Sequence, residues 1–185
     1  MFNLYQQFGK RAFDFIAASF GGITISPIFI VLAMAVKWSS KGPVFYKQER
    51  IGKGFQPFIM YKFRSMVVNN ASKNQLVTAT GDPRITTVGK FLRRYKLDEL
   101  PQLFNVIRGD MSLVGPRPEV MRYIEHYKVD YEKILQVKPG ITDNAAIAFK
   151  HEEKILAEYD NSEVAYIKKI LPMKIRLYHD YISKI

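Results

Sequence analysis

The chain has 185 residues and contains no cysteine, so disulfide scaffolds, cysteine-ligated metal centres and thiol nucleophiles are excluded. Hydrophobic residues make up 48% and charged residues 24% of the sequence, as in an ordered protein with one ordinary core. The net charge of +11 comes from the middle of the chain, since residues 37–122 hold sixteen basic and six acidic side chains. This excess favours an anionic partner: nucleic acid, a membrane surface or a phosphorylated substrate.

Residues 15–36 carry no charged side chain and would be long enough, as one straight helix, to cross a bilayer. However, Ser26-Pro27 lies near the middle, where proline removes a backbone donor. Basic residues also flank the segment on both sides, so no charge bias sets an orientation. The pattern predicts a re-entrant membrane helix over residues 1–38 that bends at Ser26-Pro27 and leaves the membrane on the side it entered. The Ser26 hydroxyl is expected to bond a carbonyl freed at the bend.

Three other interpretations of this segment stay open. It can be a kinked spanning helix, a buried core helix or a cleaved signal peptide, because Ala33-Met34-Ala35 resembles a cleavage site. The long apolar run and Asp14 at its entrance argue against the signal peptide.

Residues 39–185 are expected to form a mostly helical cytosolic domain with a small β-hairpin, which makes the fold class α+β. Residues 44–51 and 55–62 read as the two strands, separated by Gly52-Lys53-Gly54. Residues 69–82 read as a loop, and residues 109–118 as irregular. Helices are predicted over residues 86–96, 98–107, 119–134, 150–158 and 163–183, with a kink at Pro172.

The adjacent carboxylates Asp98 and Glu99 are the strongest local indication of chemistry. Asp98 is predicted to cap a helix, with Pro101 in the first turn. Arg93 and two further cations lie just upstream, and carboxylates beside cations suit a divalent metal together with a phosphate. Alternatively, Asp98 only caps the helix while the cations face anionic lipid.

Further basic residues fall in stiff or strand-terminal positions. Lys62 and Arg64 end the second predicted strand, whereas Arg84 and Arg117 lie in turns that contain glycine and proline. Rigid loops suit bidentate phosphate contacts by arginine. Taken singly, each of these features is more often an ordinary solvated turn.

Five motifs occur in order along the chain: Lys62-Phe63-Arg64-Ser65-Met66, Gly81-Asp82-Pro83-Arg84, residues 97–103, residues 109–118 and Lys138-Pro139-Gly140-Ile141-Thr142. Together with the Ser26-Pro27 break, they resemble the bacterial sugar transferases, the monotopic polyprenol-phosphate phosphoglycosyl transferases. The resemblance covers nearly the whole chain and is closest to the minimal, single-domain form. One departure follows Thr142, where many members continue with glycine and this chain has Asp143-Asn144.

The resemblance implies an enzyme that moves a sugar phosphate from a UDP-sugar to polyprenol (undecaprenyl) phosphate. Asp98 would be the nucleophile, and Asp98 and Glu99 would hold Mg²⁺. Lys62, Arg93 and Arg117 would contact phosphates or nucleotide, with Arg64 and Arg84 as weaker candidates. The resemblance also implies contact with membrane lipids at the cytoplasmic face of a bacterial inner membrane, and no nucleic-acid partner. It leaves the sugar, the glycan pathway and the oligomeric state open.

Two rival functions rest on charge and on the N-terminal segment. A membrane-anchored nucleic-acid-binding protein would use the basic middle segment, but would have no need of the Asp98-Glu99 pair. A cleaved and secreted basic domain would begin at Val36.

Overall fold

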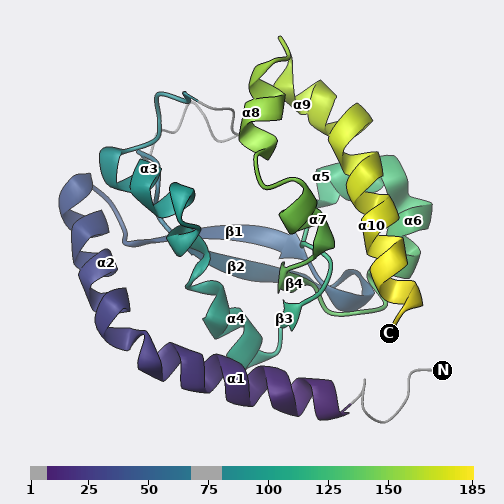
Figure 1. The fold of residues 1–185 in the computed structure, drawn as a ribbon, viewed down its shortest axis with the longest axis horizontal. Helices are drawn as coiled ribbons and strands as arrows, with labels where there is room; N and C mark the ends of the chain where they lie inside the picture. The colour runs from purple at the N-terminus through teal and green to yellow at the C-terminus, as the bar shows by residue number, and fades with distance from the viewer. Residues whose placement is uncertain (1–7, 68–80) are drawn as a thin grey trace.

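Two helices joined by a sharp bend border one side of the computed structural model, which describes residues 8–67 and 81–185 (Figure 1). Helix α1 (Lys10–Thr24) meets α2 (Ser26–Ser39) at 65°. Because Pro27 has no N–H, the carbonyl of Ile23 loses its helical donor. The Ser26 hydroxyl donates to that carbonyl instead, at 2.8 Å. Both the predicted bend and the predicted bond of Ser26 are confirmed.

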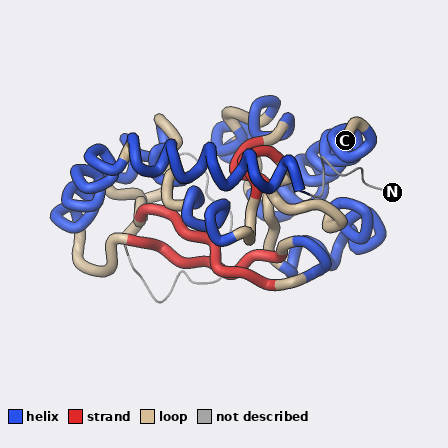
Figure 2. The backbone as a smooth tube through the Cα atoms, turned by 90° about the horizontal axis from the view of Figure 1, so that it is seen from below, coloured by secondary structure: helices blue, strands red, loops and turns tan. Residues whose placement is uncertain are grey.

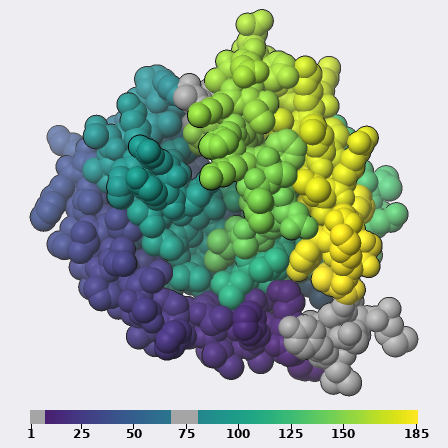
Figure 3. Space-filling view, viewed as in Figure 1, coloured from purple at the N-terminus to yellow at the C-terminus, as the bar shows by residue number. Residues whose placement is uncertain are grey.

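The two helices pack on the rest of the protein along one face only. Asp14, Ala18, Leu32 and Val36 are buried on that face. Large apolar side chains stay exposed on the remaining surface of the pair: Phe13, Phe15, Ile16, Phe20, Ile23, Ile28, Ile30, Val31, Met34 and Trp38. The pair forms an outer border of the molecule in the space-filling view (Figure 3). This exposure is incompatible with a buried core helix.

Within residues 8–67 and 81–185, no single helix is long and apolar enough to cross a membrane. The bent pair of α1 and α2 meets the length and composition requirement when the two helices are taken together.

The predicted hairpin is confirmed as strands β1 (Phe45–Ile51) and β2 (Pro57–Phe63). They pair antiparallel, with Phe45 opposite Phe63, and a 3₁₀ turn (Lys53–Phe55) links them. Gly54 in that turn has φ of 66°, which glycine adopts without strain. The loop predicted over residues 69–82 falls, up to residue 80, outside the described residues.

The hairpin packs against α3 (Thr87–Arg94) and α4 (Gln102–Arg108) as well as the bent pair. Phe63 shares one apolar cluster with Leu32, Val36 and Leu92, and Met60 shares another with Ala18, Val106 and Met111. Helix α4 lies between α1 and strand β2 and contacts both (Figure 2). The hairpin and α4 therefore hold the bent pair against the rest of the protein.

Short helices build the C-terminal part: α5 (Met121–Ile124), α6 (Lys128–Ile134), α7 (Asn144–Ala148), α8 (Glu152–Ala157), α9 (Ser162–Ala165) and α10 (Leu171–Ser183). A 3₁₀ turn (Glu125–Tyr127) separates α5 from α6, and a π-helical segment (Tyr166–Ile170) precedes α10. Pro172 lies in the first turn of α10, where its missing N–H is tolerated. The predicted helix at 119–134 is therefore interrupted, whereas the predicted helix at 163–183 is confirmed as a continuous helical run that includes the π-helical segment. Helix α7 was not predicted.

A second, two-stranded parallel sheet joins β3 (Ser112–Val114) to β4 (Gly140–Thr142). The prediction that residues 109–118 are irregular is wrong for β3, because three-residue strands are too short to show a periodic pattern. The sheet ends in a close backbone contact, since a Cβ on Gly140 would lie 2.1 Å from the amide nitrogen of Gly115. Only glycine fits at such an approach.

Candidate active site

Asp98 and Glu99 lie in a 3₁₀ turn (Leu97–Glu99) between α3 and α4. Lys96, just before the turn, has a left-handed backbone with φ of 57°, which reverses the chain after α3. The prediction that Asp98 caps a helix is wrong: α4 begins at Gln102 with Pro101 at its N-cap, and Asp98 makes no capping bond. The turn instead places the two carboxylates between the helices.

Asp98 is buried, with 6% of its surface exposed. Its Oδ1 atom has no hydrogen-bond partner among the described residues. Burial raises the pKa of the Asp98 carboxyl, against the opposing attraction of Lys62 and, more weakly, of Arg93 and Lys96. A buried carboxylate oxygen without a donor has an unmet capacity to bind a cation or to react.

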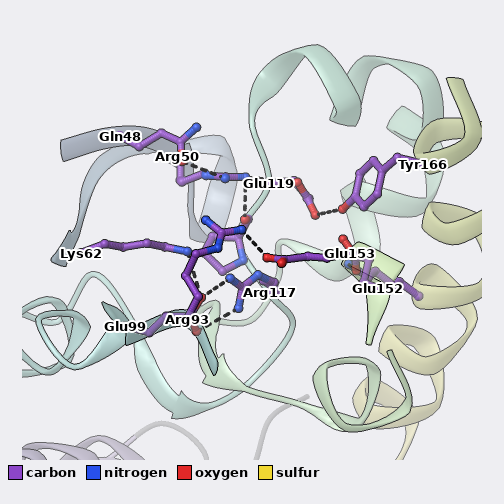
Figure 4. A network of polar contacts seen from close by, with 12 residues as sticks. Gln48, Arg50, Lys62, Arg93, Glu99, Arg117, Glu119, Glu152, Glu153 and Tyr166 are labelled. Atoms are coloured by element: carbon purple, nitrogen blue, oxygen red, sulfur yellow. Dashed lines mark hydrogen bonds and ion pairs between the residues drawn. The ribbon is translucent and has the colours of Figure 1, made fainter. Parts of the chain in front are cut away.

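Glu99 lies in the opposite surroundings, between two cations (Figure 4). Lys62 Nζ donates to Glu99 Oε1 at 2.9 Å, and Arg117 Nη1 donates to Oε2 at 3.3 Å, with Arg117 Nη2 also on Oε1. Burial alone would raise the pKa of Glu99, but the attraction of Arg117 and Lys62 outweighs it and holds the pKa well below its usual value. The surroundings therefore favour the charged form of Glu99 more strongly than that of Asp98.

The two cations come from different sheets. Lys62 extends from β2, and burial lowers the pKa of its ammonium group despite the nearby Glu99. Arg117 follows β3, and the charge of Glu99 raises the pKa of its guanidinium. The hairpin and the parallel sheet thus meet at Glu99.

Residues that follow Arg117 are fixed by a buried anchor (Figure 4). Arg50 of β1 donates through Nη1 to the carbonyl of Pro118 and to the carboxylate of Glu119, both at 3.2 Å. The Tyr166 hydroxyl donates to the same carboxylate. The two residues after Arg117 are therefore held by both Arg50 and Tyr166, and a rigid loop suits bidentate anion binding.

Arg93 reaches the site from α3. Its Nη2 group pairs with Glu153 of α8, and its charge acts on the carboxyl of Asp98. The structure thus gathers Lys62, Arg93 and Arg117 around the carboxylate pair.

The remaining two predicted site residues have other partners. Arg64 is buried and donates to the carbonyls of Val36 at 3.1 Å, Ser40 at 2.7 Å and Pro43, so it ties the end of α2 to the end of β2. Arg84 forms hydrogen bonds with Asp82, including Nε to Oδ1 at 2.9 Å. Hydrogen bonds from Arg84 lower the pKa of Asp82. Arg64 thus has a structural role in the described structure.

Sequence reasoning missed three groups that shape the site: Glu119, which anchors the Arg117 loop, Glu153, which pairs with Arg93, and Asp143 after β4. Glu119 and Glu153 were not identified as site residues, because their partners Tyr166 and Arg93 lie 47 and 60 residues away in the chain. Asp143 was visible only as a departure from the family pattern. It is 4% exposed, caps α7 through Ala146 N at 2.6 Å, and burial raises its pKa.

The chain belongs to the bacterial sugar transferase family, whose model matches residues 5–178. It is 46% identical over 141 residues to the UDP-glucose:undecaprenyl-phosphate glucose-1-phosphate transferase of Escherichia coli K12, which covers 75% of this chain and 30% of that protein. It is 41% identical over 145 residues to the UDP-N-acetylgalactosamine-undecaprenyl-phosphate N-acetylgalactosaminephosphotransferase of Aeromonas hydrophila, covering 76% and 34%. The exopolysaccharide production protein ExoY of Sinorhizobium fredii is 41% identical over 148 residues, covering 72% and 66%.

The matched region thus spans about a third of the length of the first two relatives. These relatives are named for different sugars, glucose and N-acetylgalactosamine, and share undecaprenyl phosphate in their names.

Proposed function

We propose that this protein transfers a sugar phosphate from a UDP-sugar to undecaprenyl phosphate, in two steps, through a covalent intermediate on Asp98. The observation that carries the proposal is the buried Asp98 carboxyl beside Glu99, with one oxygen that has no partner in the described part of the chain and with the charges of Lys62 and Arg93 acting on it. The names of the relatives support the substrate class.

In the first step, an Asp98 oxygen attacks the β-phosphorus of the UDP-sugar. The bond from that phosphorus to the bridging oxygen breaks, and UMP leaves with the oxygen. In the second step, a phosphate oxygen of undecaprenyl phosphate attacks the same phosphorus and releases the Asp98 carboxylate. Two displacements of this kind predict ping-pong kinetics. Lys62, Arg93 and Arg117 would neutralise the phosphate charge that accumulates during both steps.

The carboxylate pair fits a Mg²⁺ ion. The described residues contain no group of three His, Cys, Asp or Glu side chains that would hold a metal alone. Mg²⁺ in phosphate-transfer sites is instead held by one or two carboxylates together with substrate phosphates and water. Asp98 Oδ1, which has no partner within residues 8–67 and 81–185, and the ionised Glu99 would supply those two carboxylates. When bound, the ion would offset the charge of the diphosphate and of the leaving UMP.

The proposed setting is the cytoplasmic face of a bacterial inner membrane, with α1 and α2 as a re-entrant element in lipid. The apolar exposed surface of the bent pair and the Ser26 bond at the bend support this placement, because lipid cannot satisfy a freed carbonyl. Lys10, Arg11 and Asp14 at the start of α1 bond residues of β3 and α4, or each other, and would keep the active site close to the membrane.

The decisive experiment omits the lipid acceptor. Purified protein is incubated with Mg²⁺ and a panel of UDP-sugars, and both UMP and the intact mass are measured. We expect up to one UMP per enzyme and a mass gain of one sugar phosphate, mapped to the peptide that contains Asp98. A single-displacement enzyme would release UMP only after undecaprenyl phosphate is added, and would show no adduct.

A further inference from the structure

Arg93 and Glu153 connect helix α3 with helix α8 beside the candidate active site (Figure 4). Arg93 lies on α3, and Glu153 lies on α8, 60 residues further along the chain. Their side chains pair through Nη2 and Oε1. Glu153 is 40% exposed and Arg93 22% exposed, so the pair lies at the rim of the buried site.

Glu152, the residue before Glu153, ties helix α8 to helix α10. Glu152 pairs with Lys174 of α10, whose side chain is only 5% exposed. Leu156, one turn further, is buried in the C-terminal apolar cluster. Helix α8 is therefore fixed to the C-terminal helices, while Glu153 pairs with Arg93 of α3.

Every cation assigned above to phosphate binding already has a carboxylate partner. Lys62 and Arg117 share Glu99, which is 12% exposed and belongs to the site itself. The partner of Arg93 comes from outside the carboxylate pair and is more than three times as exposed. Partly exposed ion pairs contribute little stability, so Glu153 can turn into water at low cost.

We propose that Glu153 is a displaceable counter-ion that occupies Arg93 until the phosphate of the donor replaces it. The inference rests on the proposed function, because it requires that Arg93 bind a nucleotide phosphate. A phosphate offers Arg93 a bidentate, more highly charged partner than a carboxylate. After the nucleotide leaves, Glu153 returns to Arg93, which favours release of UMP before the lipid acceptor reacts. Because Glu153 competes with the donor phosphate for Arg93, it also weakens binding of the donor.

The test uses UDP as the probe, since it carries the diphosphate and needs no knowledge of the sugar. The Kd of UDP is measured by calorimetry on the full chain in nanodiscs with Mg²⁺. We expect Glu153→Gln, which removes the competing charge, to bind UDP about three- to tenfold more tightly than wild type. The matched control is Glu158→Gln, which changes the same charge at the exposed end of α8 and should alter the Kd less than twofold.

The same comparison in an Arg93→Ala background isolates the pair. We expect Arg93→Ala to weaken UDP binding and to abolish the effect of Glu153→Gln. Unchanged or weaker binding by Glu153→Gln overturns the inference, and so does an effect that persists without Arg93, which would indicate general repulsion. Wild-type protein that binds no UDP contradicts the proposed function itself, and the inference with it. Wild-type binding without the Glu153 effect contradicts the inference alone.

Discussion

Asp98 and Glu99 are neighbours in the chain, yet their carboxyl groups lie in opposite electrostatic surroundings. The pKa of Asp98 is raised by burial, and Oδ1 has no partner among the described residues. The pKa of Glu99 is held well below its usual value by Arg117 and Lys62, which outweigh its burial. Pairs of acids with diverging pKa values are typical of divided catalytic roles. Under the proposed function, this contrast assigns the reactive role to Asp98 and the charge-holding role to Glu99.

This division predicts that the two residues fail differently. Asp98→Asn keeps the shape of the side chain, but an amide cannot form the acyl phosphate, so turnover and the mass adduct should both vanish. Glu99→Gln should leave a trace of turnover that rises with Mg²⁺ concentration, because only one metal ligand is weakened. UMP release is measured for both variants across a range of Mg²⁺ concentrations. Normal turnover by Asp98→Asn would refute the nucleophile assignment while leaving the family membership intact.

Arg117 is predicted to act through the geometry of its guanidinium. Both of its terminal nitrogens face Glu99, and its loop is anchored by Glu119. Lysine offers a point charge in place of a planar fork. Arg117→Lys should therefore lower kcat/KM by about 10- to 100-fold, the scale of one charged hydrogen bond. If Arg117→Lys kept a near-normal kcat/KM, Arg117 would act only through its positive charge. The control is Arg122→Lys, because Arg122 is exposed and forms an ion pair with Glu163.

Local patterns in the sequence predicted several of the elements that surround the candidate active site. The hairpin, the bend at Ser26-Pro27 and the helix at α3 each depend on residues close in the chain, such as Thr86, which caps α3 through Gly89 N at 2.8 Å. The sequence and its family resemblance also identified five residues that converge in the structure: Lys62, Arg93, Asp98, Glu99 and Arg117.

The features that the sequence did not predict depend on the tertiary structure. The strands β3 and β4 have three residues each and exist through their mutual pairing. The capping role of Asp98 was wrong because the backbone of Lys96 turns left-handed, which its residue type does not indicate. Arg64 was grouped with the phosphate-binding residues by its motif, yet three backbone carbonyls hold its guanidinium. Each of these outcomes required the tertiary structure.

The re-entrant placement of α1 and α2 predicts a topology that can be measured directly. The chain has no cysteine, so single cysteines at Asn3 and Ser40 provide clean labelling sites. Both should react with an impermeant reagent from the same face of the membrane. Labelling from opposite faces would show a spanning helix. Pro27→Ala restores the backbone donor for Ile23, so it should straighten the pair and shift the two sites towards opposite faces.

The buried carboxyl of Asp143 predicts that the stability of the protein depends on pH. Its carboxyl is 4% exposed, Oδ2 has no partner among the described residues, and burial raises its pKa. The folded state therefore holds the Asp143 proton more tightly than the unfolded chain does. The stability that this gives is present at pH below about 4, the ordinary pKa of aspartate, and is lost as pH rises through the raised pKa.

Above its raised pKa, the ionised Asp143 thus costs stability, and Asp143→Asn should remove that cost. Asparagine is also a good N-cap, so the bond from Ala146 N is kept. We expect the Tm of the variant to exceed that of wild type by about 2–4 °C at pH 7, the shift expected for roughly 1 kcal/mol in a domain of this size. The difference should shrink as the pH is lowered towards 4, and the exposed Asp160→Asn should show neither effect. A lower Tm at pH 7 would mean that Arg117 and Lys174, whose charges oppose the shift, stabilise the ionised form more than burial penalises it.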